Sequence, residues 1–321
     1  MPQTGAKKPE LEYRFYNIDS GHFFLPKVGD GWEQEYGKGL NGQLHFHNLM
    51  EIGYCFHGSG TVVIGDKKER YSDAFFTIIP KHIPHTTMSD PGHKCLWNYL
   101  FIDFENFCQS SIKDGGTFSA EEIIDAVSKN GVISSKEENP GIAEHIQDML
   151  FECTKKQKYY EDILMYEFLS VLVELLRHTE ENALLIKKNK REQYLTPALD
   201  YIDKNFAENI KIKDLADLCA LSESHFRRTF EEIMEMKPLD YVNFVRIRKA
   251  CDLIRKTSMS MQDISLEIGY DTISTFNRNF RKLTGTTPYK WKEAPGNKDL
   301  DLSDFHISAK KGWEANGVTP K

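Results

Sequence analysis

A helical pattern in the last third of this chain occurs twice, in copies fifty residues apart. Identical residues recur at that interval: Phe226 and Phe276, Arg228 and Arg278, Phe230 and Phe280, and Pro238 and Pro288. Each copy has the pattern of a short helix, a tight turn and a second amphipathic helix, which is typical of a helix-turn-helix. Because the interval holds at many positions at once, the repeat predicts two such units, each placing one helix in a DNA major groove.

Capping residues set the expected ends of these helices. Ser222 and Asp271 precede the second helix of each unit, where a side-chain oxygen can accept an unpaired backbone N–H. Gly269 permits the left-handed conformation that ends the first helix of the second copy. A helix over residues 239–255 joins the units, and Arg246 within it is expected to make a structural ion pair.

Net charge alone argues weakly against nucleic-acid binding. The chain has 41 Lys and Arg against 48 Asp and Glu, a formal net charge of −7. The excess lies in residues 1–191, whereas residues 192–295 are neutral. A neutral domain can still bind DNA if its positive charges share one face, because the phosphate field acts over a Debye length of about 8–10 Å.

The preceding part of the chain predicts short strands followed by two helices. Residues 60–64 and 75–79 have strand patterns that end at Gly65 and Pro80, and short strands at close spacing over residues 11–107 suggest a sandwich or barrel. Two apolar stripes with helical spacing lie within residues 141–179.

The sequence predicts a cytoplasmic protein with reduced thiols and no membrane segment. No apolar run approaches membrane-spanning length, and residues 1–10 lack the apolar core of a signal peptide. The six cysteines are scattered without a C-x-x-C pair, so we expect buried thiols rather than disulfides or a zinc site.

The second copy resembles the motif of AraC-type transcription regulators. Its sequence over residues 264–270 is ISLEIGY, and Phe276 and Phe280 lead into RKLTGTTP, which ends at Pro288. The first copy, from Asp214 to Tyr241, is similar to the same motif. The resemblance implies a C-terminal double helix-turn-helix domain that binds promoter DNA, usually under the control of an N-terminal domain.

The resemblance also implies which side chains contact DNA. Exposed positions near the start of each second helix would read bases, since Arg can read guanine and Asn adenine. These are Ser224, His225 and Arg228, and Thr272, Thr275 and Asn277, with Ser274 on the same face. Phosphate contacts fit Arg227, Arg278, Arg281 and Lys282 better. The first copy departs from the family in having Glu231, Glu232 and Glu235, so the second is expected to carry at least as much of the binding energy.

The N-terminal part contains a histidine pattern that resembles the first cupin motif. Gly39, His45, His47, Glu51 and Gly58 have its spacing, and His85 follows in a degenerate second motif. Alternation along a strand places His45 and His47 on one face, and Glu51 on the same face if the strand is unbroken. These four polar residues suit either Zn, Fe, Mn or Ni, or a hydroxyl-rich effector. Tyr54, Trp97 and Trp32 are candidates to stack on a sugar ring, and equally to fill the core.

The predicted protein is therefore an α+β chain of two domains. Residues 1–180 are expected to form a cupin-like β-barrel with a helical pair, 181–193 a linker, 194–295 the all-α double helix-turn-helix, and 296–321 a tail without regular structure. The function expected is regulation of transcription by a non-enzyme, with promoter DNA, a small effector such as a carbohydrate, and RNA polymerase, for an activator, as partners.

Three alternatives stay open at this point. The barrel could be a metal-dependent enzyme joined to a DNA-binding domain, using His45, His47, Glu51 and His85 as ligands. It could instead be an effector-free dimerisation scaffold. The helices within residues 141–179 resemble the pair through which such regulators form homodimers, yet an apolar stripe is equally explained by packing on the barrel.

Overall fold

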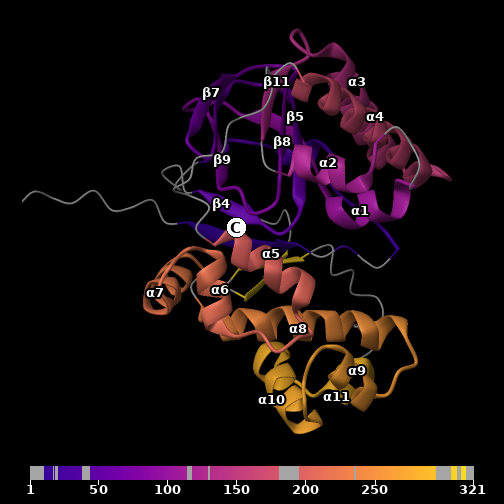
Figure 1. Cartoon of the computed structure of the whole chain (residues 1–321). Coiled ribbons are helices and arrows are strands. Elements are labelled where there is room, and N and C mark those ends of the chain that lie inside the picture. Colours follow the sequence, from indigo (N-terminus) through magenta and orange to yellow (C-terminus); the bar gives the residue numbers. More distant parts are fainter. Residues whose placement is uncertain are drawn as a thin grey trace, which may run out of the picture. The chain divides into compact units, whose positions relative to one another are not determined.

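The computed structural model divides the chain into two compact units (Figure 1). It describes residues 11–16, 18, 21–37, 44–113, 118–128, 131–180, 195–234, 236–293, 305–308 and 312–315. The N-terminal unit comprises residues 1–192, 303–308 and 313–321, and the C-terminal unit residues 193–302 and 309–312. The predicted division into a strand-rich part and a helical part is confirmed. The expected linker and Gly39 lie outside the described residues.

The strands of the N-terminal unit form two sheets. The larger has the order β13-β12-β1-β4-β9-β6-β7, and the smaller β11-β8-β5-β10-β2, with β3 paired to β10. The strands of the larger sheet are β1 (Glu12–Tyr16), β4 (His45–His47), β6 (Gly60–Ile64), β7 (Lys67–Tyr71), β9 (His85–Ser89), β12 (Phe305–Ser308) and β13 (Gly312–Ala315). Those of the smaller are β2 (Phe24–Lys27), β3 (Glu33–Gln34), β5 (Met50–His57), β8 (Phe75–Ile79), β10 (Cys95–Ile102) and β11 (Val132–Ser135). The ladders of the described strands do not close into a barrel.

Alternation explains the strands that the sequence predicts best. In β6 every second residue is buried, so Val62 and Ile64 enter the core while Thr61 and Val63 are more exposed. A tight turn at Gly65, with φ +56°, leads into β7. The strands predicted at residues 60–64 and 75–79 are confirmed as β6 and β8.

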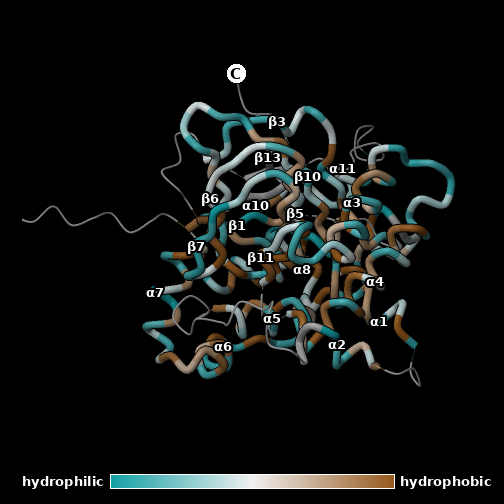
Figure 2. Tube along the Cα trace, turned by 90° about the horizontal axis from the view of Figure 1, so that it is seen from above, coloured by the Kyte–Doolittle hydropathy of each residue, from teal (hydrophilic) through white to brown (hydrophobic). Residues whose placement is uncertain are grey.

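Four helices follow and pack within the N-terminal unit. They are α1 (Phe104–Ser111), α2 (Ala120–Val127), α3 (Pro140–Lys155) and α4 (Tyr160–Glu180). Along α4, Figure 2 shows hydrophobic and hydrophilic stretches alternating, as expected of a helix with one buried face. Its apolar stripe, with that of α3, shares one core with β5, β8 and β10. Both predicted stripes are therefore used for packing inside the unit.

Over the described residues 195–293, the regular structure of the C-terminal unit is entirely helical. The helices are α5 (Thr196–Asn205), α6 (Ile212–Leu218), α7 (Glu223–Met234), α8 (Pro238–Lys256), α9 (Met261–Glu267), α10 (Ile273–Thr284) and α11 (Pro288–Glu293). The fifty-residue interval recurs in the packing. The ring centroids of Phe226 and Phe230 are 5.5 Å apart, and those of Phe276 and Phe280 are 5.6 Å apart. Two helix-turn-helix units, α6–α7 and α9–α10, are thus joined by α8, as predicted.

The helix caps agree with the predictions at two positions out of three. Ser222 accepts from the N–H of His225, and Gly269 has φ +84°. Ser260 caps α9 by accepting from the N–H of Asp263. The prediction for α10 is wrong by one residue, because Thr272 rather than Asp271 is the N-cap and accepts from the N–H of Thr275. The turn that Gly269 opens leaves Thr272 as the residue with extended backbone next to the helix.

Two strands lie in the tail, where the sequence predicts no regular structure. β12 pairs antiparallel with β1, with Tyr16 opposite His306 and Arg14 opposite Ser308. β13 follows it at the edge of the larger sheet. These segments are four residues each, too short to give a periodic signal.

The six cysteines are free and buried, as expected. Burial raises the pKa of Cys108, Cys153 and Cys251 to about 12, so almost none of these thiols is ionised at pH 8. We expect the native protein to react slowly with an aromatic disulfide reagent at pH 8, and all six thiols to react at once in guanidinium chloride. Rapid stoichiometric reaction of the native protein would contradict the burial. Within the described residues, no helix is long and apolar enough to span a membrane.

Candidate functional site

The outer faces of α7 and α10 form the candidate DNA interface. In each helix two phenylalanines point into the core, and the predicted DNA-contacting side chains take the other positions. Nine of these are exposed, namely Ser224, His225, Arg227, Arg228, Thr272, Ser274, Arg278, Arg281 and Lys282. Thr275 and Asn277 are half-buried.

The two helices differ in how far their cations are already neutralised. On α7 the guanidinium of Arg227 lies 2.6 Å from the carboxylate of Glu223, and that of Arg228 lies 3.8 Å from Glu232. On α10, Arg278 and Arg281 make no ion pair or hydrogen bond with any residue that the structure describes. Lys282 pairs with Asp240 of α8 at 2.7 Å. The second unit therefore offers two guanidinium groups that a phosphate can bind without first displacing a carboxylate.

Two of the residues predicted to read bases, Thr272 and Thr275, also form the N-terminal cap of α10. Thr272 donates its hydroxyl to that of Thr275 at 2.9 Å and accepts from the Thr275 N–H. Asn277 differs, because its Oδ1 is buried and accepts no hydrogen bond from the described residues. Thr272 and Thr275 can thus reach DNA only while keeping the cap.

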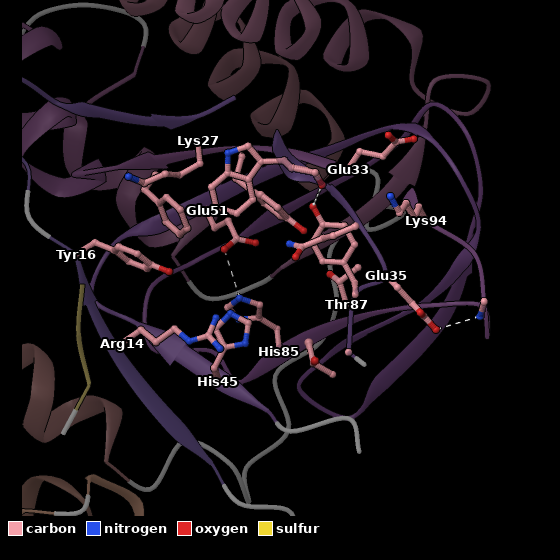
Figure 3. Close-up of a pocket in the computed structure, with 18 residues that line it drawn as sticks. Arg14, Tyr16, Lys27, Glu33, Glu35, His45, Glu51, His85, Thr87 and Lys94 are labelled. Atoms are coloured by element: carbon pink, nitrogen blue, oxygen red, sulfur yellow. Dashed lines mark hydrogen bonds and ion pairs between the residues drawn. The ribbon is translucent and has the colours of Figure 1, made fainter. Parts of the chain in front are cut away.

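A cavity of about 750 Å³ lies between the two sheets of the N-terminal unit. Figure 3 shows side chains from both sheets converging on it, among them Arg14, Tyr16, His45 and His85 from the larger and Glu51 from the smaller. The remaining lining includes four aromatic rings, contributed by Trp32, Tyr36, Tyr99 and Phe101. Arg14, Lys27 and Lys94 balance Glu33, Glu35 and Glu51 in formal charge.

Some of the predicted effector residues lie elsewhere. Tyr54 is buried in the core between the smaller sheet and the helices, on the opposite face from Glu51. Trp97 is fully buried beside the cavity, stacked on Tyr99 with ring centroids 6.0 Å apart. Trp32 does line the cavity. The alternation rule would have excluded Tyr54, since it is three residues from Glu51 along β5.

The structure brings His45, His47, Glu51 and His85 together. His45 lies opposite His85 in the β4–β9 pair, and one potential ligand atom from each of the four residues lies within 4.8 Å of all the others. Glu51 approaches from β5, with its Oε2 3.1 Å from His47 Nε2 and 3.5 Å from His85 Nε2. Three of the four side chains are buried, and His45 is half-buried.

Backbone carbonyls fix the orientation of two of these rings. His47 Nδ1 lies 2.8 Å from the carbonyl oxygen of Leu49, and His85 Nδ1 lies 2.8 Å from that of Ile83. Since a carbonyl only accepts, each Nδ1 carries a proton and each Nε2 faces the cluster. Contacts of this kind orient imidazoles that bind metals.

A neutral His47 ring carries only one N–H, so it cannot donate a hydrogen bond to both the Leu49 carbonyl and the Glu51 carboxylate. Burial lowers the pKa of His47 and so favours that neutral form. Burial would raise the pKa of Glu51, but the adjacent His85 and His47 outweigh it and hold that pKa well below its usual range. A neutral His47 then turns the Nε2 lone pair toward a carboxylate oxygen, and a proton or a cation between the two atoms would remove this repulsion.

Comparisons with known proteins concern the C-terminal unit most closely. Residues 215–294 match the family described as Helix-turn-helix domain. Over 94 residues the chain is 34% identical to the bifunctional transcriptional activator/DNA repair enzyme AdaA of Bacillus subtilis, a match that spans 29% of this chain and only 44% of AdaA.

Two further matches cover most of the chain. The raffinose operon regulatory protein RafR of Pediococcus pentosaceus is 23% identical over 76% of this chain and 85% of its own. The crystal structure of ToxT from Vibrio cholerae, with an unsaturated fatty acid bound, covers 84% of this chain and 92% of its own, at 15% identity and a TM-score of 0.38. Residues 215–294 of the C-terminal unit form a helix-turn-helix domain.

Proposed function

We propose that this chain is a sequence-specific DNA-binding transcription regulator that responds to a small effector. The observation that carries the proposal is the paired helix-turn-helix, in which α7 and α10 each bury two phenylalanines and expose a polar face. Such a pair suits two successive major-groove segments of promoter DNA. RNA polymerase would be a further partner if the protein activates transcription.

Base reading is assigned to the start of each helix and phosphate binding to the cations farther along. Ser224, His225 and Arg228 would read bases from α7, and Thr272, Thr275 and Asn277 from α10, with Ser274 beside them. Arg227, Arg278, Arg281 and Lys282 would bind phosphates. The ion pairs on α7 support a larger share of the affinity for α10.

Two substitutions on α10 separate these roles. On a duplex selected by the wild-type protein from a randomised pool, Asn277→Ala is expected to cost about 1–3 kcal/mol and to relax specificity at one base pair. Arg281→Ala should weaken binding evenly on all sequences and reduce the salt slope by about 1, because one phosphate contact is lost. Fluorescence anisotropy over a salt series measures both.

Lys158→Ala is the matched control, since it removes one exposed cation from the N-terminal unit. A sequence-selective loss for Arg281→Ala would exclude the phosphate role. If Asn277→Ala discriminates between duplex sequences as well as the wild type does, Asn277 does not read a base.

The cavity supports a carbohydrate as the effector. Its formal charges balance, which disfavours a ligand of high net charge, and its carboxylates, cations and tyrosine hydroxyls can bond to many hydroxyl groups. Trp32, Tyr36 and Tyr99 provide aromatic faces for the apolar face of a sugar ring. A volume of about 750 Å³ is within the range of small-molecule sites.

A second candidate function is metal binding at the base of the same cavity. The observation that favours it is the inward-facing Nε2 of His47 and His85 around the Glu51 carboxylate. His45, His47, Glu51 and His85 would hold the ion, and three imidazoles with one carboxylate suit a divalent transition metal. A bound ion would polarise a ligand oxygen as a Lewis acid, so this candidate includes a metal-dependent enzyme.

One thermal-shift experiment distinguishes the two candidates. Purified protein is melted with mono- and oligosaccharides, with and without a chelator, and its metal content is measured by mass spectrometry. A sugar at a hundred times its dissociation constant should stabilise the unit that binds it by about 2.7 kcal/mol. A shift that survives chelation supports the metal-free sensor. A melting temperature that falls on chelation, with stoichiometric metal beforehand, supports the second candidate.

Homodimerisation through α3 and α4 would need surfaces other than the predicted stripes, which are buried. Phe151 of α3 and Tyr166 of α4 are 57% and 71% exposed. We propose these outward positions as the dimer contact. Sedimentation of Tyr166→Lys against wild type tests it, and an unchanged dimer fraction would exclude that contact.

A further inference from the structure

The C-terminal unit contains a direct contact between its two helix-turn-helix halves, besides the connecting helix α8. The loop that follows α5 reaches the second half at residues 206–208. Phe206 packs against the core of that half, which contains Phe276 and Phe280. A Cβ added to Gly269, in the turn between α9 and α10, would be only 2.2 Å from the carbonyl oxygen of Ala207. The loop backbone therefore lies directly on this turn.

Arg246 of α8 holds the loop in place from the other side. Its Nε donates to the carbonyl oxygen of Phe206, and its second terminal nitrogen donates to that of Glu208, both at 2.7 Å. No acidic group lies within ion-pair distance of it among the described residues, so the prediction of a structural ion pair is wrong. A guanidinium already engaged with two carbonyls is also poorly suited to bind a phosphate.

The same guanidinium stacks on the second half. Its carbon lies 5.3 Å from the ring centroid of Tyr270, the residue after Gly269. Tyr270 is buried, and its hydroxyl donates to Asn243 of α8 at 2.8 Å. One planar group thus bonds to the loop of the first half and packs on the turn of the second, which a point charge cannot do.

We infer that Arg246 is a positioning residue that fixes α7 and α10 relative to one another and so matches them to two segments of one DNA duplex. The inference rests on the proposed function, because a fixed separation matters only if both helices bind the same duplex. α8 itself packs into the core of the second half through Ile247, Ala250, Cys251 and Ile254, whereas residues 257–260, between α8 and α9, are neither helix nor strand. The attachment at residues 206–208 is a second link between the halves and restricts their relative motion before binding.

The binding test uses the full chain and the duplex selected by the wild type. Arg246→Met should bind a duplex with both segments at least ~10-fold more weakly, and a duplex with one segment scrambled less than ~2-fold more weakly than the wild type does. Inserting one base pair between the segments should cost the variant less than it costs the wild type. Arg246→Lys should resemble Arg246→Met, whereas a phosphate contact would be rescued by Lys. Equal losses on both duplexes, or no loss, would overturn the inference.

A distance measurement tests the inference without DNA. Spin labels at Glu231→Cys of α7 and Lys290→Cys of α11 report the separation of the two halves, and the buried native thiols leave these sites to react. Arg246→Met should broaden the distance distribution. Lys249→Met, which removes a cation 5.8 Å from the Phe206 ring, should not. Equal widths in the folded variant and wild type would overturn the positioning role, and a wild type that selects no DNA sequence would overturn only the proposed function.

Discussion

Gly269→Ala is expected to destabilise the C-terminal unit by about 2–4 kcal/mol. Two costs add at this position. The backbone has φ +84°, which disfavours any residue with a Cβ by about 1 kcal/mol, and the new methyl group would meet the Ala207 carbonyl oxygen at 2.2 Å. The oxygen is part of the backbone, so the loop at residues 206–208 must move, at a cost of about 1–3 kcal/mol. Chemical denaturation followed by circular dichroism gives the free energy of unfolding.

Gly285→Ala is the matched control. Gly285 ends α10 with φ +75°, but a Cβ there would meet nothing within 4 Å. Only the conformational cost of about 1 kcal/mol is expected. The difference between the two variants isolates the contact with the loop, and equal losses would mean that the loop yields without cost.

Phe280→Ala is expected to destabilise the same unit by about 3–5 kcal/mol, since it leaves a large cavity in a core where the side chain is completely buried. Phe230→Ala should cost a similar amount, because Phe230 is also completely buried at the corresponding place in the first half. Both are measured by chemical denaturation of the full chain.

Phe280→Leu provides the comparison, as it keeps most of the apolar volume and should cost much less. If Phe230→Ala cost less than about 1 kcal/mol, the first half would not share the packing of the second.

The sequence repeat predicted the helical unit well because its information is local. Phenylalanines four residues apart must lie on one face of a helix, and the ring distances in the two halves agree to 0.1 Å. The cap of α10 was missed by one position because Asp271 and Thr272 are both good capping residues. Which of them caps depends on the path of the turn at Gly269, and that path depends on the distant loop at residues 206–208.

The cavity was predicted only where a motif carried the pattern. His45 and His47 share a face of β4 by alternation, but Glu51 enters from β5 of the other sheet, because the strand breaks after His47, and it was found only through the spacing of the motif. Arg14, Tyr16 and Lys27 were missed, because they enter through the pairing of β1 with β4 and of β2 with β10. Strand pairing between segments far apart in sequence is not encoded in any local period.

The pairing of β12 with β1 has a topological consequence. The chain leaves the sheets of the N-terminal unit, builds the helices from α5 to α11, and then returns to pair with the strand that carries Arg14 and Tyr16. The helical unit is therefore an insertion whose two ends are both joined to strands of the N-terminal unit. The conformational entropy of its chain is that of a closed loop rather than that of a free tail. Truncation after residue 295 would open this loop and remove β12, which would expose the edge of β1, a strand that lines the cavity.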